Sequence, residues 1–301
     1  MVSKQESISE EEFKSLCSLN AENLSKKSAH TFLVCVDGSD QSDVAFLSAM
    51  NLRKKYDHIC IFHAFKGDHI ESLPTKFKPK ILREKYEVDL TGSIPSDRFS
   101  FIWEDRKGKP VINTLNLAVE KQRDQLPGGD LPDFVLMGHH GRKGPKELPT
   151  SLGSNSDRAL RALPLPCFII KKMINRGPRS YVMAVDESDL SIRGLDILLR
   201  IVNPRDSITC VHFYQSDDDI AQYDGMKQQY EKDLEEFGPI NSRFLLIEKE
   251  RGKALTRSIV EYVEESECDI FAIAPRAKQT LSSLSDYVVN HVSCNVLLCK
   301  N

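Results

Sequence analysis

The sequence predicts an α/β protein made of two tandem doubly wound domains, each a five-stranded parallel sheet with helices on both faces. Short apolar segments rich in β-branched residues alternate with segments of helical periodicity, which is typical of βαβ units. The same segments recur in the same order about 145 residues later. With 301 residues, 40% of them hydrophobic, the chain is long enough for two ordinary cores.

The predicted strands are the clearest part of the repeat. Residues 31–40, TFLVCVDGSD, match residues 180–189, SYVMAVDESD, and both segments end in Val-Asp-x-Ser-Asp. The same offset of 149 aligns 57–65 with 206–214. Three further pairs of strand-like segments follow in the same order: 98–103 with 243–248, 132–138 with 268–274, and 156–172 with 285–301.

Helical patterns separate these strands. Apolar residues between 44 and 52 form one helical face, and residues 111–119 have apolar spacings of three and four. The second of these patterns returns at 254–263. Strands and helices that alternate in this way predict parallel sheets buried on both faces.

Two segments lie outside the repeat. Residues 1–30 hold a capping-box pattern at Ser9 and Glu12, which predicts an extra helix packed on the body, with a partner-binding arm as the alternative. Residues 173–179 form a short basic linker with a Gly-Pro pair. The linker separates a first domain, 31–172, from a second domain, 180–301.

Composition excludes several classes of protein. The formal net charge is −3, so no global basicity favours nucleic acid. The apolar runs are too short to span a bilayer, and residues 1–13 lack the apolar core of a signal peptide. We therefore expect a cytoplasmic protein that binds neither nucleic acid nor membrane.

Cysteine usage agrees with that expectation. The eight cysteines are too sparse for a disulfide scaffold, and no CxxC pair is present. We expect buried, reduced thiols that act as small hydrophobic residues. Five of them lie in strand-like runs: Cys35, Cys60, Cys167, Cys210 and Cys299.

Candidate binding residues follow the first and fourth predicted strands. Open parallel sheets bind ligands at the carboxyl ends of their strands, where the strand order reverses. Residues 37–39, Asp-Gly-Ser, follow the first strand, and the glycine-rich segment 138–144 follows the fourth. These two segments should therefore meet at one edge of the first sheet.

A third segment adds an anion site. Gly153 allows close approach of a ligand, and the Ser-Asn-Ser sequence at 154–156 offers preferred N-cap residues for a helix. A helix N-terminus attracts anions, phosphate above all. Nearby positive charge comes from Arg142, Lys143 and Lys146. The alternative interpretation is an ordinary glycine-bearing loop before a capped helix.

Other nucleotide and catalytic motifs are absent. The sequence has no G-x-G-x-x-G after a strand, no GxxxxGK[ST] and no G-x-S-x-G, which argues against dinucleotide-binding, P-loop and α/β-hydrolase proteins. His139 and His140 lack a third metal ligand in the sequence. No protein-only metal site and no catalytic residue are therefore predicted.

The chain resembles the universal stress protein family in its tandem form. The resemblance covers 31–172 and 180–301 and rests on VDGS at 36–39, on LMG at 136–138, and on Gly138-x2-Gly141 followed by Gly153-Ser154. The ATP-binding branch of the family has the pattern G-x2-G-x9-G-(S/T) at this loop. This sequence has 11 residues between Gly141 and Gly153, two more than the pattern.

The resemblance implies an ATP site in the first domain. It places the adenosine end near the first two strands, with the ribose on Asp37. It places the ribose and α-phosphate beside 137–141 and the β- and γ-phosphates at 153–156, with Mg²⁺ bridging phosphates. The implied ATP-binding residues are Val36, Asp37, Gly38, Ser39, Ala64, Met137, Gly138, His140, Gly141, Gly153, Ser154, Asn155 and Ser156.

The second domain departs from this pattern. Glu187 replaces Gly38, alanines 274 and 277 replace the loop glycines, and Ser282-Ser283 stands where Gly153-Ser154 stood, after a loop seven residues shorter. We expect this domain not to bind ATP. Residues 216–238 also carry eight acidic and two basic side chains, a net charge of −6, whereas residues 74–80 are basic. Two solvated faces, or a partner-selecting asymmetry, explain that difference.

The predicted function is that of an ATP-binding stress-response or signalling protein, with at most slow ATP hydrolysis. The first alternative is a nucleotide-free interaction scaffold of the same fold. The second is an adenylyl transferase or ATP-pyrophosphatase, although the usual loops of these enzymes are missing. Members of the family that the chain resembles commonly dimerise through the last strand. The resemblance therefore implies that 166–172 and 295–301 pair within one chain as a pseudo-dimer and cover each other's edges, with a homodimer or a protein partner left open.

Overall fold

A computed structural model of the chain describes residues 29–122, 132–144, 149–275 and 281–300. The helix predicted within residues 1–30 therefore lies outside the described residues, as do Lys146 and Ala277. Within the described ranges, no helix is both long and apolar enough to cross a membrane.

The first half of the chain, residues 31–172, contains five strands that alternate with four helices. Their order confirms the order predicted from the sequence, and each strand overlaps its predicted segment. The first strand ends five residues before the predicted segment 31–40 does, and residues 156–162 of the last predicted segment are helical. Short 3-10 turns, η1 (Gly67–His69) and η2 (Thr75–Phe77), precede the second helix. The elements are β1 (Thr31–Cys35), α2 (Asp40–Leu52), β2 (His58–Phe65), α3 (Pro79–Thr91), β3 (Phe99–Asp105), α4 (Val111–Gln122), β4 (Phe134–Gly138), α5 (Ser154–Ala162) and β5 (Cys167–Ile170).

The second half, residues 180–301, repeats that order. Its first helix even begins in the same way, because Ser188 accepts a hydrogen bond from Ser191 N as Ser39 accepts one from Ser42 N. These serine caps satisfy a backbone donor at the start of each helix. The elements are β6 (Ser180–Ala184), α6 (Asp189–Leu199), β7 (Ser207–Gln215), η4 (Ile220–Tyr223), α7 (Asp224–Phe237), β8 (Asn241–Lys249), α8 (Leu255–Ser266), β9 (Ile270–Ile273), α9 (Ser283–His291) and β10 (Asn295–Leu298).

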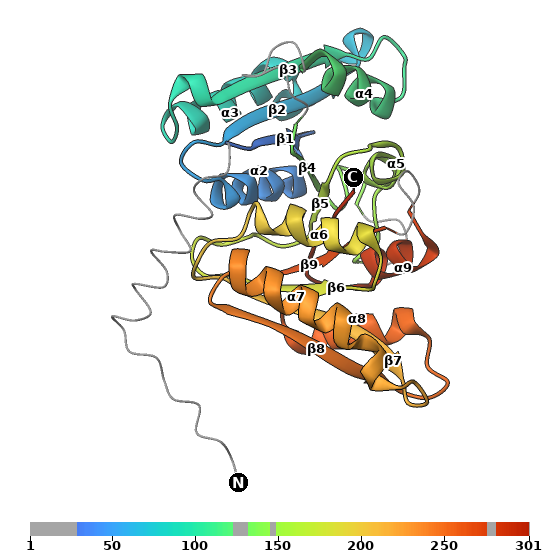
Figure 1. The fold of residues 1–301 in the computed structure, drawn as a ribbon. Helices are drawn as coiled ribbons and strands as arrows, with labels where there is room; N and C mark the ends of the chain where they lie inside the picture. The colour runs from blue at the N-terminus through green and yellow to red at the C-terminus, as the bar shows by residue number, and fades with distance from the viewer. Residues whose placement is uncertain (1–28, 123–131, 145–148, 276–280, 301) are drawn as a thin grey trace.

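All ten strands belong to one sheet. Its order is β3-β2-β1-β4-β5-β10-β9-β6-β7-β8, so each half has the predicted doubly wound order. Strands within a half are parallel, whereas β5 and β10 pair antiparallel, with Phe168 opposite Leu297. Figure 1 shows the two halves stacked, with β5 and β10 meeting between them. The predicted pairing of the two last strands within one chain is therefore confirmed.

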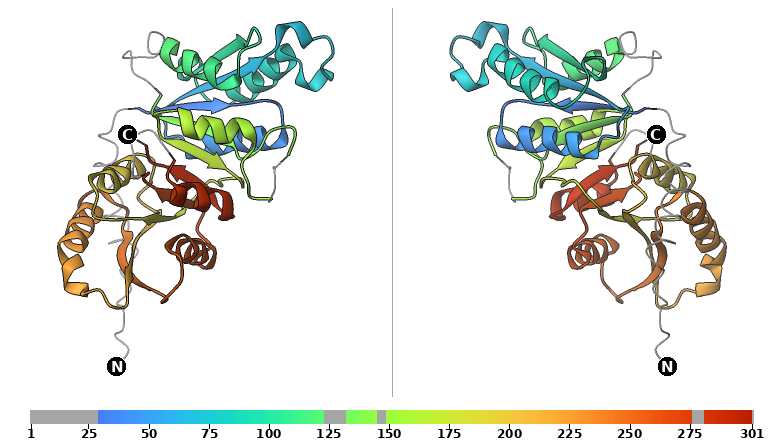
Figure 2. Two further views of the ribbon diagram at one scale, coloured as in Figure 1. Left: turned by 90° about the vertical axis from the view of Figure 1, so that its right-hand side faces the viewer. Right: turned by 90° about the vertical axis from the view of Figure 1, so that its left-hand side faces the viewer.

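Helices cover both faces of this sheet (Figure 2). One core lies under α2, α3, α6 and α7 and buries side chains such as Phe46, Tyr86 and Tyr230. The other lies under α4, α5, α8 and α9 and buries Leu160 and Val288. Each core contains residues of both halves, so apolar burial continues across the β5–β10 junction and holds the halves together.

The linker between the halves is anchored to the first half. Asn51 Nδ2, on α2, donates a hydrogen bond of 2.8 Å to Ile174 O, and Arg179 Nη2 donates one of 2.6 Å to Asn51 O. Arg179 is buried beside the buried carboxylate of Asp206, 3.9 Å away. The basic side chain of Arg179 therefore connects α2 of the first half with Asp206 of the second half.

Candidate functional site

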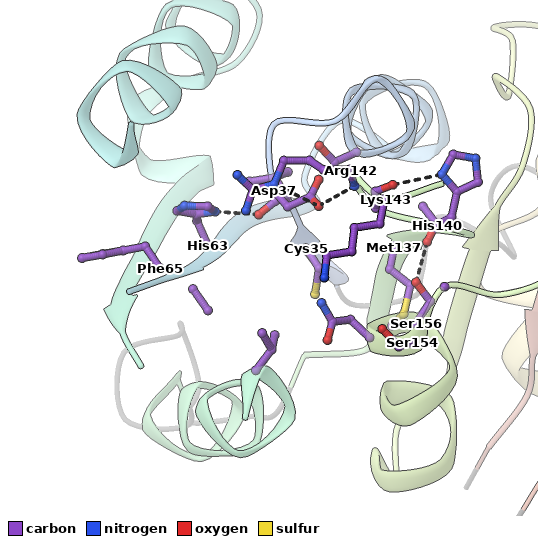
Figure 3. Close-up of a pocket in the computed structure, with 18 of the residues that line it drawn as sticks. Cys35, Asp37, His63, Phe65, Met137, His140, Arg142, Lys143, Ser154 and Ser156 are labelled. Atoms are coloured by element: carbon purple, nitrogen blue, oxygen red, sulfur yellow. Dashed lines mark hydrogen bonds and ion pairs between the residues drawn. The ribbon is translucent and has the colours of Figure 1, made fainter. Parts of the chain in front are cut away.

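A pocket of about 830 Å³ opens at the carboxyl ends of the first four strands (Figure 3). The pocket lies between the neighbouring strands β1 and β4. From β1 the chain continues to β2 on one side of this pair, and from β4 it continues to β5 on the other side. Such a switch point leaves a crevice that adjacent helices do not cover. The sheet topology therefore creates the pocket at the edge that the sequence predicted.

Most of the predicted site residues line this pocket. Gly38 and Ser39 do not. Gly38 has a φ of +82° and packs against Phe77 and Leu82, while Ser39 caps α2. Both residues therefore shape the turn that follows β1. The predicted residues that do line the pocket are Val36, Asp37, Ala64, Met137, Gly138, His140, Gly141, Gly153, Ser154, Asn155 and Ser156.

The start of α5 differs from the prediction in one respect. The N-cap residue is Gly153, and residues 154–156 are the first three residues of the helix itself. The prediction that the three polar side chains cap the helix is therefore wrong, because Ser156 Oγ instead donates a hydrogen bond of 2.8 Å to Gly138 O. Glycine has no side chain that can accept from the first helical N–H groups. These donors and the positive end of the helix dipole are left to face an anion.

Two glycines allow the loops of the site to approach one another. A Cβ on Gly153 would lie 3.0 Å from His140 Cα, and Gly153 N donates a 2.7 Å hydrogen bond to His139 O. A Cβ on Gly138 would lie 2.8 Å from Gln41 O, a backbone atom of α2. Gly138 is therefore required by the packing of α2 on β4, a role that sequence reasoning did not assign to it.

Asp37 forms hydrogen bonds with both loops that flank it. Its Oδ1 accepts from Ser39 N at 3.0 Å and from Ser39 Oγ at 2.6 Å. Its Oδ2 accepts from Arg142 N at 3.3 Å and lies 3.9 Å from Arg142 Nε. The Asp37 side chain keeps 36% of its surface exposed, so hydroxyl groups of a ligand could still reach it.

The pocket lining is strongly biased toward positive charge. Among the described lining residues, Asp37 is the one carboxylate, whereas Lys66, Arg106, Arg142 and Lys143 are cationic. Arg106 Nε is buried and has no hydrogen-bond partner among the residues that the structure describes. An anionic ligand would compensate this charge.

Sequence reasoning missed two of these cations. Lys66 directly follows β2 and Arg106 directly follows β3, and Arg106 N donates to Phe65 O at 2.8 Å. The available signal was their position at strand ends on the ligand-binding edge of a parallel sheet. That signal was applied only to the first and fourth strands.

The wall between the charged groups is apolar. It includes Phe62, Phe65, Leu115 and Met137, with Ala64 leaving space between them. His63 is buried in this wall and its Nδ1 lies 2.8 Å from Val36 O. Burial lowers the pKa of His63, so its imidazole is neutral at pH 7. A flat, uncharged ring system would fit this part of the pocket.

Comparison with solved structures tests the fold. A universal stress protein from Archaeoglobus fulgidus superposes with a TM-score of 0.59 at 17% identity, over 90% of this chain and 96% of that one. A protein of unknown function from Pseudomonas aeruginosa PAO1 gives 0.55 at 13% identity, over 93% and 94%. The chain has the universal stress protein fold. No protein-family model and no curated protein sequence matches the chain.

Within this universal stress protein fold, the second half has aromatic contacts at the corresponding strand ends. Phe213 stands at the strand position of Ala64, and its ring packs edge-on against Tyr262 with 6.0 Å between centroids. Tyr223 packs on His212, the counterpart of His63, with 4.7 Å between centroids.

The helix terminus of the second half is also satisfied internally. Ser282 is the N-cap of α9, and its Oγ accepts a hydrogen bond of 3.1 Å from Ser285 N. The equivalent residue of the first half is Gly153, which cannot form such a bond. One half of this universal stress protein fold therefore presents free donors at its site, and the other uses its own side chain.

The histidine pair is held by the protein itself. His139 Nδ1 lies 3.2 Å from Gln41 Oε1, and His139 Nε2 lies 3.2 Å from Pro149 O. Burial lowers the pKa of His139. Among the residues with described positions, no three His, Cys, Asp or Glu side chains converge on a potential metal site.

Proposed function

We propose that the first half of the chain binds one ATP molecule, and that the protein is a nucleotide-binding stress-response or signalling protein. The observation that carries this proposal is the contrast between the two helix termini. Gly153 leaves the N–H groups of α5 open toward the pocket, whereas Ser282 closes the same position in α9. A polyphosphate is the usual anion for an open helix terminus at such a crevice.

The pocket offers a complementary surface to each part of ATP. The apolar wall around Ala64 suits adenine, and Asp37 suits the ribose hydroxyls. The start of α5 and the Lys143 side chain suit the phosphates. A bound Mg²⁺ would reach the site on phosphate oxygens and supply charge neutralisation there, with the protein contributing few direct ligands.

The lining residues favour binding over rapid turnover. The Asp37 carboxylate is engaged by Ser39 and Arg142, and the neutral His63 imidazole is engaged by the Val36 carbonyl. Neither group is free to act as a general base on water near the start of α5. We infer that ATP acts as a ligand that biases conformation or assembly, with at most slow hydrolysis. A cytoplasmic location and a possible protein partner stay predictions.

Calorimetric titration with Mg-ATP tests this proposal. We expect the full chain to bind one nucleotide. Gly153→Asp, which adds a carboxylate at the anion end, should abolish binding, because it opposes the phosphates and the helix dipole. Ser282→Asp makes the matching change in the second half and should leave binding intact. Circular dichroism of each variant separates lost binding from lost folding.

Two outcomes would contradict the proposal. No heat with the wild-type chain, together with no nucleotide released on denaturation, would favour the nucleotide-free scaffold. Equal binding by the wild type and Gly153→Asp would place the nucleotide somewhere other than α5. Release of AMP or pyrophosphate at turnover rates would instead favour an enzyme.

A further inference from the structure

Two cysteines meet at the edge of the second half that lies opposite its strand carboxyl ends. Cys268 lies just before β9 and Cys294 just before β10, two neighbouring parallel strands. Their Sγ atoms are 3.8 Å apart, although the residues are 26 positions apart in the chain. Both are buried, with 6% and 5% of their surface exposed. They are free thiols in direct contact.

The internal repeat shows that the fold itself does not require this pair. The repeat aligns Cys268 with Pro132 and Cys294 with Leu165, so the first half has no sulfur at either position. The first half forms the same strand pair without them, with Val135 opposite Cys167 in β4 and β5. Both positions have become cysteine in the same half, at a place where the two side chains touch.

The surroundings make the two thiols chemically unequal. The hydrogen-bonded contact with the Cys294 sulfur, together with the Ser266 hydroxyl, lowers the pKa of Cys268. The hydrogen-bonded contact with the Cys268 sulfur, followed by burial, raises the pKa of Cys294, against the nearby Lys171 ammonium group. Cys268 is therefore the better nucleophile of the pair, and Cys294 is placed to react second.

We propose that Cys268 and Cys294 form a reversible redox dithiol that is oxidised to a disulfide by hydrogen peroxide. The Cys268 thiolate attacks one peroxide oxygen, the O–O bond breaks, and sulfenic acid forms as the other oxygen leaves as hydroxide, which takes up the proton released by the Cys268 thiol and becomes water. The Cys294 sulfur then attacks the Cys268 sulfur, and the hydroxyl group leaves as a second water. Two thiols and one peroxide thus give one disulfide and two waters.

The geometry permits this bond without separating the strands. A disulfide needs its sulfurs about 2.05 Å apart and its Cα atoms about 4.4–6.8 Å apart. Extending the register of β9 and β10, in which Ile270 pairs with Asn295, puts Cys268 and Cys294 one residue out of register. With strands about 4.8 Å apart and about 3.3 Å of rise per residue, such a diagonal pair has a Cα separation of about 5.8 Å, within that range. The sulfurs, now 3.8 Å apart, must therefore close by roughly 2 Å.

The position of the pair connects oxidation to the junction between the halves. Asn295, the residue after Cys294, accepts hydrogen bonds at Oδ1 from Lys171 N at 2.9 Å and Lys172 N at 3.0 Å. It also donates from Nδ2 to Asp269 O, next to Cys268, at 3.0 Å. A disulfide would link the residues just before β9 and β10, and through Asn295 these residues are hydrogen-bonded to Lys171 and Lys172, which follow β5. We expect it to raise resistance to unfolding at this junction.

Peptide mapping of the full chain tests the proposal. The reduced protein is treated with hydrogen peroxide, its remaining thiols are alkylated, and its peptides are identified by mass. We expect a linked peptide pair carrying Cys268 and Cys294 that lacks two hydrogens and is split by dithiothreitol. Cys268→Ser and Cys294→Ser should each lose this link. Cys210→Ser removes a buried thiol of β7 and should retain it.

Three results would overturn the proposal. They are recovery of both cysteines as alkylated thiols after peroxide, their oxidation to separate sulfinic acids, and a link from either one to a different cysteine. The mapping of the wild-type chain decides the matter even if a serine variant fails to fold. A thiol count in denaturant gives a second measure, since it should fall by two on oxidation.

Discussion

Lys171 of the first half caps the last helix of the second half, and Lys300 of the second half caps the last helix of the first half. Lys171 follows β5, and its Nζ donates hydrogen bonds of 2.6 and 2.5 Å to the carbonyl oxygens of Val289 and Val292, at the end of α9. Lys300 follows β10, and its Nζ donates one of 2.8 Å to Leu163 O, at the end of α5. Carbonyls at a helix C-terminus lack partners within the helix and favour a cation. The last helix of each half is thus completed by the other half.

The buried ammonium group of Lys171 predicts a pH-dependent stability. Burial lowers the pKa of Lys171 from its ordinary value of 10.5 to about 8. Between these values the unfolded chain binds more protons than the folded one, so the free energy of unfolding rises with pH. The contribution of this lysine is about 3 kcal/mol across the window, since one pKa unit is worth about 1.4 kcal/mol.

Urea unfolding of the wild type and Lys171→Met at pH 7.5 and pH 10 checks this prediction. The free energy of unfolding of the wild type should rise relative to that of Lys171→Met between pH 7.5 and pH 10. Lys172→Met, at the exposed neighbouring lysine, is the control and should follow the wild type. Parallel behaviour of the wild type and Lys171→Met at both pH values would contradict a depressed pKa.

The contacts of Lys171 and Lys300 with the helix ends are features that the sequence did not predict. The doubly wound order follows from periodicity and from the internal repeat, whereas the pairing of β5 with β10 was expected from the family resemblance. Lys171 and Val289 are 118 positions apart, and nothing in either segment signals their contact. The two lysines were interpreted as ends of strands, and their partners became visible only in three dimensions.

In the site, too, the residues that belong to sequence motifs were predicted, whereas contacts between residues far apart in the chain were not. The polar and glycine residues around Asp37 and Gly153 were predicted because motifs carry them. The cap of α5 was assigned to the wrong residues, because a Ser-Asn-Ser sequence fits either the cap or the first turn. The long-range hydrogen bond from Ser156 to Gly138 decides between these two positions. Lys66 and Arg106 belong to no motif, and only the packing of neighbouring strands brings them to the pocket.

Ala64→Phe should close the proposed nucleotide site. This change copies the second half, where Phe213 fills the corresponding space against Tyr262. We expect at least a tenfold loss of ATP affinity, about 1.4 kcal/mol or more, because the ring occupies the apolar wall. Calorimetry with Mg-ATP measures this loss. Phe213→Ala is the matched control and should leave ATP affinity unchanged. Tight binding by Ala64→Phe would show that the base lies elsewhere.

Gly138→Ala should destabilise the protein through α2. The new Cβ would lie 2.8 Å from Gln41 O, a backbone atom that cannot rotate away. Overpacking of this kind costs about 1–3 kcal/mol, so we expect a lower urea midpoint in the variant. Gly92→Ala is the control, because its nearest neighbour, Val88 O, would be 3.6 Å away. Unchanged stability with lost ATP binding would instead assign Gly138 to ligand approach.

Ser282→Ala should destabilise the second half without affecting the nucleotide. Ser282 Oγ accepts from Ser285 N at the start of α9, and a helix cap of this type contributes about 1 kcal/mol. Urea unfolding of the variant should show that loss, while calorimetry should return the wild-type ATP affinity. Ser283→Ala, at the exposed first helical residue, is the control and should change neither quantity by much. A change in ATP affinity with Ser282→Ala would mean that the terminus of α9 also binds nucleotide, and that the two halves are not divided between an open and a closed site.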